Sequence, residues 1–212
     1  MNSTKFVLLG AGGHAKMLVS ILRRQGIHIA AVCAPQRPES ALFSAIPYLA
    51  SDDEVLQFPA DQVRLINGVG ALPGQTLRRS LFEHFSALGY QFSSVIADSA
   101  IIDNSAQLGA GVQIMPGAIV NADTQLAPNV LVNSGAIIEH DCVVQTHSVI
   151  SPGAVLCGGV KCGENSYIGA GATVIQGLSV GVNALVGAGS TLVCNLLDNQ
   201  KIYSAQPFIK AE

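Results

Sequence analysis

A histidine between two acidic residues, Glu139-His140-Asp141, is the feature of the sequence with the clearest chemical potential. Between residues 96 and 192 only seven side chains are charged, and two of them flank this histidine. A neighbouring carboxylate can fix the tautomer of an imidazole and stabilise its protonated form, which tunes a general base near neutral pH. The alternative is a solvated polar turn without chemistry. The apolar residues on either side favour a partly dry cleft, and therefore a catalytic role.

A second candidate site is the glycine-rich segment Gly10–Ala15, which follows a short apolar run and precedes a helical pattern. It satisfies G-x-G-x-x-G/A, in which glycines let a phosphate approach the backbone and the helix N-terminus supplies N–H groups. An NAD site also needs an acidic residue after the second strand, and here Val32 leads into Cys33-Ala34-Pro35. A mononucleotide diphosphate that carries one sugar fits the size of this region better than NAD.

The segments around the glycine-rich loop alternate between strand and helix. The patterns predict strands at 6–9, 27–32 and 63–67. They also predict two helices, one that begins after Gly13 and one that spans 77–88. In the second helix we expect Leu77 to face inward and Arg78-Arg79 to face outward. This alternation indicates a small, parallel, Rossmann-like α/β domain over residues 1–92 that binds a nucleotide.

The region that positions His140 has a strict six-residue period. Aliphatic residues recur at every sixth position from Ile96 to Leu192, with one cysteine among them, and small residues recur four positions further on. Such a hexapeptide repeat is typical of a parallel β-helix, in which six residues make a strand and a turn, and three such units make a triangular coil. We therefore expect a β-helix at 93–194, without large loop excursions, and a C-terminal tail at 195–212.

Residues just before the aliphatic positions should face away from the interior of the coil. Between residues 131 and 155 they are apolar on every face, which predicts a band of exposed apolar surface. Such a band usually marks an interface, so we expect a cyclic homo-oligomer; cover by a terminal segment of the same chain is the alternative. These outward residues are Leu131, Ile137, Val143, Val149 and Val155.

Composition narrows the classes of function. The net charge is −3 and no strongly basic stretch occurs, so nucleic-acid binding is not expected. No apolar run approaches the length of a signal-peptide core or a membrane span, which favours a cytoplasmic protein without membrane insertion. The five cysteines show no disulfide-scaffold spacing and are expected to be free thiols, with no metal bound.

The loop and helix that begin with Gly-Ala-Gly-Gly-His-Ala, followed by hexapeptide repeats that contain the segment 132–142, resemble a known enzyme family. The sequence is similar to the bacterial sugar acyltransferases of the sialic-acid O-acetyltransferase and bacillosamine-pathway N-acetyltransferase type. The resemblance covers nearly the whole chain and implies a left-handed β-helix. It also implies a homotrimer that binds acetyl-CoA between adjacent β-helices and acts on a nucleotide-linked 4-amino-4,6-dideoxy sugar for surface glycan synthesis.

The resemblance also implies roles for individual residues. His140 would take the proton of the attacking amine, Asp141 would raise its basicity, and Asn133 would shape the sugar and acyl site. The nucleotide-sugar diphosphate would be held by Gly12, Gly13 and His14. The groove for acetyl-CoA would be lined by Gly158, Ala170 and Ala188, together with Val149, which stands where the family often has a second histidine.

Three other functions share parts of this pattern. An O-acetyltransferase that acts on a sugar hydroxyl, including sialic acid, would have every motif above. A zinc hydratase on a trimeric β-helix would need three histidine ligands at an interface, and the repeat region contains only His140 and His147. A non-catalytic scaffold would have no evident use for the acidic residues around His140.

Overall fold

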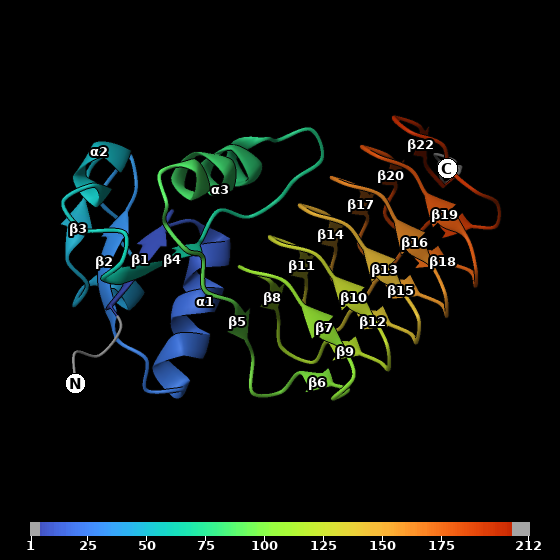
Figure 1. Cartoon of the computed structure of the whole chain (residues 1–212), viewed down its shortest axis with the longest axis horizontal. Coiled ribbons are helices and arrows are strands. Elements are labelled where there is room, and N and C mark those ends of the chain that lie inside the picture. The colour runs from blue at the N-terminus through green and yellow to red at the C-terminus, as the bar shows by residue number, and fades with distance from the viewer. Residues whose placement is uncertain (1–4, 205–212) are drawn as a thin grey trace, which may run out of the picture. The chain divides into compact units, whose positions relative to one another are not determined.

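The computed structural model describes residues 5–204 and divides the chain into two units (Figure 1). The first unit comprises Met1–Asp98 with Gly109–Ile114, and the second comprises Ser99–Leu108 with Met115–Glu212. The first therefore includes one short segment from the repeat region. Each unit has its own buried core, and each contains one of the two candidate sites.

The first unit is built on a parallel four-stranded sheet with the strand order β3-β2-β1-β4. Its strands are β1 (Lys5–Leu9), β2 (Ile29–Cys33), β3 (Tyr48–Leu49) and β4 (Val63–Asn67). Its helices are α1 (Gly13–Arg24), a 3-10 turn at Ala41–Phe43, α2 (Asp52–Val55) and α3 (Leu77–Ala87). The sheet order confirms the predicted parallel α/β unit. Within the described residues, no helix is both long enough and apolar enough to cross a membrane.

The orientation predicted for helix α3 is wrong at its first turn. Leu77 is 56% exposed, whereas Arg78 is only 5% exposed. The guanidinium is held in the interior through Nη1, which donates to the carbonyl oxygens of Asn67 and Val69 and to the side-chain oxygen of Gln113. Its Nε and Nη2 have no hydrogen-bond partner among the described residues. A buried charge needs such partners, and the sequence pattern of the helix alone does not reveal them.

The second unit is a parallel β-helix in which two-residue strands pair with the third strand along the chain, except at the end, where β20 pairs with β22. Figure 1 shows the strands stacked in sequence order. Three faces result, and we name each by its first strand in this unit. The β6 face holds β6 (Ile101–Ile102), β9 (Ile119–Val120), β12 (Ile137–Ile138), β15 (Val155–Leu156), β18 (Thr173–Val174) and β21 (Thr191–Leu192). The β7 face holds β7 (Gln107–Leu108), β10 (Gln125–Leu126), β13 (Val143–Val144), β16 (Lys161–Cys162) and β19 (Ser179–Val180). The β11 face holds β11 (Leu131–Val132), β14 (Val149–Ile150), β17 (Tyr167–Ile168), β20 (Leu185–Val186) and β22 (Lys201–Ile202).

The six-residue period corresponds to the interior of the coil, as predicted. From Ile114 to Leu192 every sixth residue is at most 2% exposed, including Cys162 at its place in the series. The small residues four positions later are buried as well, among them Ala136 and Ala154. In the first unit β5 (Val95–Ile96) pairs with β8 (Gln113–Ile114) in the same parallel register. Strand β22 continues the pairing beyond Leu192, and residues 205–212 of the predicted tail lie outside the described residues.

The prediction of an apolar band exposed on every face is only partly right. On the β11 face, Leu131 is 1% and Val149 is 5% exposed in the isolated chain, so neither belongs to a free surface. On the β6 face, Ile137 and Val155 keep partial exposure and continue a stripe that begins at Ile101, which is 63% exposed. The β7 face carries mainly polar outward residues. The period alone distinguishes inward from outward positions, but it does not determine how exposed each outward side chain is.

Candidate active site

His140 lies in the turn between β12 and β13, at the edge where the β6 and β7 faces meet. Asp141 follows with a φ of 59°, in the left-handed region, and its N–H donates to the carbonyl of Ala122 in the preceding coil. The carbonyl of His140 accepts from the N–H of Gly159 in the next coil. The turn is thus held from both sides, while the side chains of His140 and Asp141 are each 65% exposed.

The two side chains form a short contact, with His140 Nδ1 at 2.7 Å from Asp141 Oδ2. Because a carboxylate only accepts hydrogen bonds, Nδ1 carries the proton and Nε2 has the free lone pair. The hydrogen bond that His140 donates to Asp141, followed by the negative charges of Asp141 and Glu139, raises the pKa of His140 above its ordinary value. His140 therefore has the tautomer and the basicity that a general base needs.

Gly158, in the coil after His140, lies next to the basic nitrogen of the His140 ring. A Cβ atom at this position would stand 2.7 Å from both Nε2 and Cε1 of the ring, closer than real Cβ contacts allow. The φ of Gly158 is not in the left-handed region, so the absent side chain is required by space and not by the backbone. A side chain at position 158, one coil after 140, would therefore displace the imidazole from its place against the coil.

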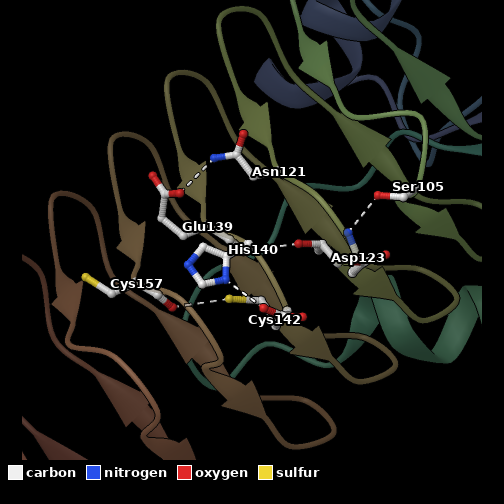
Figure 2. A network of polar contacts seen from close by, with 9 residues as sticks. Ser105, Asn121, Asp123, Glu139, His140, Cys142 and Cys157 are labelled. Carbon is white, nitrogen blue, oxygen red and sulfur yellow. Dashed lines mark hydrogen bonds and ion pairs between the residues drawn. The ribbon is translucent and has the colours of Figure 1, made fainter.

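Glu139 does not reach the ring but is tied to the preceding coil. Asn121 Nδ2 donates to Glu139 Oε2 at 2.9 Å (Figure 2). The hydroxyl of Thr124 donates to the backbone carbonyl of Glu139. Asn121 was not predicted as a site residue, although the spacing of 18 residues from Glu139 places the two on adjacent coils at the same edge. Asp141 is thus the carboxylate that acts on His140 directly, and Glu139 stabilises the turn and adds charge.

Cys142 and Cys162 are buried thiols and not nucleophiles. Cys142 points into the coil and its Sγ donates to the carbonyl of Cys157 at 3.3 Å (Figure 2). Burial raises the pKa of the Cys142 thiol to about 11 and that of Cys162 to about 12, so both stay protonated at neutral pH. None of the five cysteines forms a disulfide in the described part of the chain. A covalent thioester intermediate on Cys142 is therefore disfavoured.

The remaining predicted residues of the acyl site occupy other parts of the coil. Asn133 precedes β12 whereas His140 follows it, so the two border the β6 face at opposite edges. Ala170 and Ala188 are exposed and lie on the Asn133 edge, one coil apart. Val149 lies on the β11 face. One chain therefore brings only Gly158 next to His140, and the roles of the other four stay predictions.

Gly12, Gly13 and His14 lie together at the start of α1. Gly12 caps the helix without a side-chain hydrogen bond, and Gly12 and Gly13 have nothing within 4 Å of a built Cβ. Beside them is a hollow lined by Ala11, Gly12, Lys16 and residues 34–40. The helix start and this hollow could hold a phosphorylated ligand, since backbone N–H groups there have no helical partner. The His14 ring turns elsewhere, with Nε2 at 2.7 Å from Gln113 Oε1.

Within residues 5–204, no group of three or more His, Cys, Asp and Glu side chains is arranged to hold a metal ion. The fold and the turn around His140 instead define a class of protein. This class has a parallel α/β unit followed by a β-helix of hexapeptide repeats, as in acyltransferases, and a histidine base that is hydrogen-bonded to a carboxylate.

Comparison with solved structures identifies the family. The perosamine N-acetyltransferase of Caulobacter crescentus, solved as a histidine-to-asparagine variant with CoA and GDP-perosamine, is 31% identical, and the match has a TM-score of 0.84 and covers 93% of this chain and 92% of that one. The acetyltransferase domain of PglB from Neisseria gonorrhoeae is 30% identical, with a TM-score of 0.84 and coverage of 94% and 96%. No protein-family model matches the chain, and no curated protein does.

The chain belongs to the sugar N-acetyltransferases of the hexapeptide-repeat family, which confirms the predicted resemblance, the left-handed β-helix and the acetyltransferase activity. WeeI from Acinetobacter baumannii, at 22% identity and a TM-score of 0.81, shares the fold. The PglB domain has also been solved with acetyl coenzyme A, in agreement with the predicted co-substrate.

Proposed function

We propose that this chain transfers an acetyl group from acetyl-CoA to the 4-amino group of a nucleotide-linked 4-amino-4,6-dideoxy sugar. The observation that carries the proposal is the arrangement at His140: Nδ1 bound to Asp141, and Nε2 free above Gly158 on an exposed turn. The relatives with CoA, acetyl-CoA and GDP-perosamine bound give the substrate classes. Such sugars are precursors of bacterial surface glycans, and the reaction would take place in the cytoplasm.

The chemistry asked of the chain is a proton transfer. A sugar amine reaches the site mainly as an ammonium and must lose a proton before it attacks the thioester carbonyl. Nε2 of His140 accepts that proton, and Asp141 stabilises the resulting imidazolium through Nδ1–H. Cys142 is buried and protonated, so the acetyl group passes directly from CoA to the amine without an enzyme-bound intermediate.

The active enzyme is proposed to be a homotrimer that is joined through the β6 face. Its outward residues form an apolar, partly exposed stripe, whereas those of the β7 face are mainly polar. A contiguous apolar stripe on one face is typical of an interface. The stripe consists of Ile101, Ile119, Ile137 and Val155.

The same face explains why the predicted acyl-site residues are separated in one chain. His140 and Gly158 border one edge of the β6 face, and Asn133, Ala170 and Ala188 border the other. If copies pack through this face, the first edge of one copy approaches the second edge of its neighbour. Acetyl-CoA would then lie in the groove between two copies, with residues from both around the thioester.

The test is a direct assay of acetyl transfer from acetyl-CoA with a panel of acceptors. The panel contains GDP-, UDP- and dTDP-linked 4-amino-4,6-dideoxy sugars, the matched 4-hydroxy nucleotide sugars and sialic acid. We expect transfer to at least one amino sugar and none to its 4-hydroxy counterpart. Transfer only to hydroxyl acceptors would make the chain an O-acetyltransferase and overturn the proposal, and sedimentation of the same preparation tests the trimer.

A further inference from the structure

The ring of His14 belongs to a buried polar cluster that takes no part in the proposed proton transfer. It links the first turn of α1 to β8, α3 and the end of β4. His14 Nε2 lies 2.7 Å from Gln113 Oε1, Arg78 Nη1 lies 3.1 Å from the same oxygen, and Gln113 Nε2 donates to the carbonyl of Asn67 at 2.8 Å. Gln113 is 0% and Arg78 is 5% exposed, so solvent does not compete for these contacts.

The orientation of the Gln113 amide is fixed by two neighbours. A guanidinium has only donors, so the atom that faces Arg78 must be the oxygen. A backbone carbonyl only accepts, so the atom that faces Asn67 must be the nitrogen. Both contacts give the same orientation, and the side chain has no freedom to flip without losing both hydrogen bonds.

This orientation determines the tautomer of His14. The Gln113 oxygen can only accept, so Nε2 of His14 carries the hydrogen and Nδ1 has a free lone pair. Burial, followed by the positive charge of Arg78, lowers the pKa of His14 to about 4, so the ring stays neutral at physiological pH. Within residues 5–204 Nδ1 makes no hydrogen bond. A lone pair repels phosphate oxygens, so the backbone N–H groups at the start of α1 remain for the diphosphate, and the ring requires a donor.

The position of the ring indicates which part of the ligand supplies that donor. The hollow lined by Lys16 and residues 34–40 offers space for a nucleoside on one side of the helix start, and His14 is not among its lining residues. The His14 side chain lies instead toward Gly70, where a Cβ atom would stand 3.3 Å from the Cβ of His14. With the nucleoside on the Lys16 side, the group on the other side of the diphosphate is the sugar.

We propose that Nδ1 of His14 accepts a hydrogen bond from an O–H or N–H group of the sugar attached to the diphosphate, and so helps to select the sugar. Gln113 and Arg78 are positioning residues, because they hold the ring in the accepting tautomer. The inference rests on the proposed function, since it takes a nucleotide-linked sugar as the ligand. It assigns the ring to the sugar and the backbone of Gly13 and His14 to the diphosphate.

The test compares two substitutions that each keep one side of the ring. His14→Asn places an amide oxygen near the position of Nδ1, whereas His14→Gln reaches toward Gln113 but offers no acceptor at Nδ1. Loss of one neutral hydrogen bond should raise the KM for the nucleotide amino sugar about tenfold in His14→Gln, and by less in His14→Asn. Calorimetry with the nucleoside diphosphate alone should give the same affinity for both variants as for the wild type, within about twofold.

Two results would overturn the inference. One is an equal loss of affinity for the nucleoside diphosphate and for the nucleotide sugar in His14→Gln, which would assign the ring to the diphosphate or the nucleoside. The other is ¹⁵N NMR of the wild type that finds the ring hydrogen on Nδ1. Wild-type turnover in the acceptor panel tests the proposed function separately. If the wild type were inactive while His14 carried its hydrogen on Nε2, the proposed substrate would be wrong and the tautomer assignment would stand.

Discussion

His140 and His14 are two histidines of the same chain in opposite environments. His140 lies on an exposed turn of the β-helix, next to a carboxylate that raises its pKa. His14 is half-buried in the α/β unit, next to an amide and a guanidinium, and burial with the charge of Arg78 lowers its pKa to about 4. The partner of the first ring makes it more basic, whereas the second ring stays neutral at physiological pH.

The difference shows that the partner of the imidazole decides its role. Asp141 takes the Nδ1 hydrogen and leaves Nε2 basic, whereas Gln113 takes the Nε2 hydrogen and leaves Nδ1 as an acceptor. The β-helix thus supplies a base that acts on the reacting amine, and the α/β unit supplies an acceptor that recognises the sugar. The first kind of residue should govern kcat, and the second should govern the KM of one substrate.

The largest effect is expected from removal of the base. His140→Ala should lower kcat by about 10²–10⁴-fold with modest change in either KM, because general-base assistance is lost and binding is not. Steady-state kinetics measures this, with His147→Ala as the control, since His147 is a buried histidine on the same β-helix. Unchanged turnover in His140→Ala would show that His140 is not the general base.

The next effect is expected from Gly158→Ala. The new methyl group would stand 2.7 Å from Nε2 and Cε1, so the ring must move by several tenths of an ångström or more. Misplacement of a catalytic group by about 1 Å can cost roughly 100-fold, and we expect a loss of about 10–100-fold in kcat. Thermal denaturation should change little, because Ala can adopt the φ at this position.

The neighbouring substitution Cys157→Ala lies in the same turn and is the matched control. It keeps the backbone carbonyl that accepts from Cys142 and adds nothing beside the ring. If Gly158→Ala raises the KM for acetyl-CoA and leaves kcat unchanged, the glycine makes room for CoA and not for the imidazole.

A smaller effect is expected from Asp141→Asn. The hydrogen bond that Asp141 accepts from His140 is the main cause of the raised pKa of His140, so its weakening should lower that pKa. The base is active when neutral, and the acid limb of the pH profile of kcat should therefore move to lower pH. Since both side chains are 65% exposed, we expect only about a tenfold loss of kcat at the plateau.

Glu139→Gln is the matched control for Asp141→Asn. Glu139 acts on His140 only through its charge, the last of the causes that raise the pKa, and it is bound to Asn121. It should move the acid limb in the same direction by a smaller amount. An equal or larger shift in Glu139→Gln would mean that net charge, and not the Asp141 hydrogen bond, tunes the base.

The sequence was sufficient for the parts of the molecule that repeat. The period that contains Ile138 and Val144 fixed the interior of the coil and placed His140 in a turn, because a parallel coil cannot slip without exposing every aliphatic side chain. The glycine-rich motif predicted the start of α1 for a similar reason, since its spacing reflects local backbone geometry.

The parts that depend on contacts between distant segments could not be predicted. Arg78 was expected to face solvent because charged residues usually do, and nothing in α3 signals the carbonyls of Asn67 and Val69 that receive it. Gln113 interrupts no pattern, although it orients His14 from 99 residues away. The burial of Leu131 and Val149 was likewise not predicted, because the repeat separates inward from outward positions but does not encode the exposure of each outward side chain.

The smallest expected effect concerns stability and tests the His14 half of the comparison. In the unfolded chain His14 takes up a proton near pH 6.5, but in the folded chain only near pH 4, so between these values the unfolded state binds more protons. The free energy of unfolding should therefore fall as the pH is lowered through this window. Because His14 is half-buried, solvent screening limits the loss to about 1 kcal/mol.

Urea unfolding at pH 6.5 and pH 4.5 should show the difference in the wild type and a smaller one in His14→Gln. His140 has the opposite sign, since its raised pKa adds stability at low pH that is lost as the pH rises through the folded value. An equal pH dependence in both proteins would contradict a His14 that stays neutral in the fold.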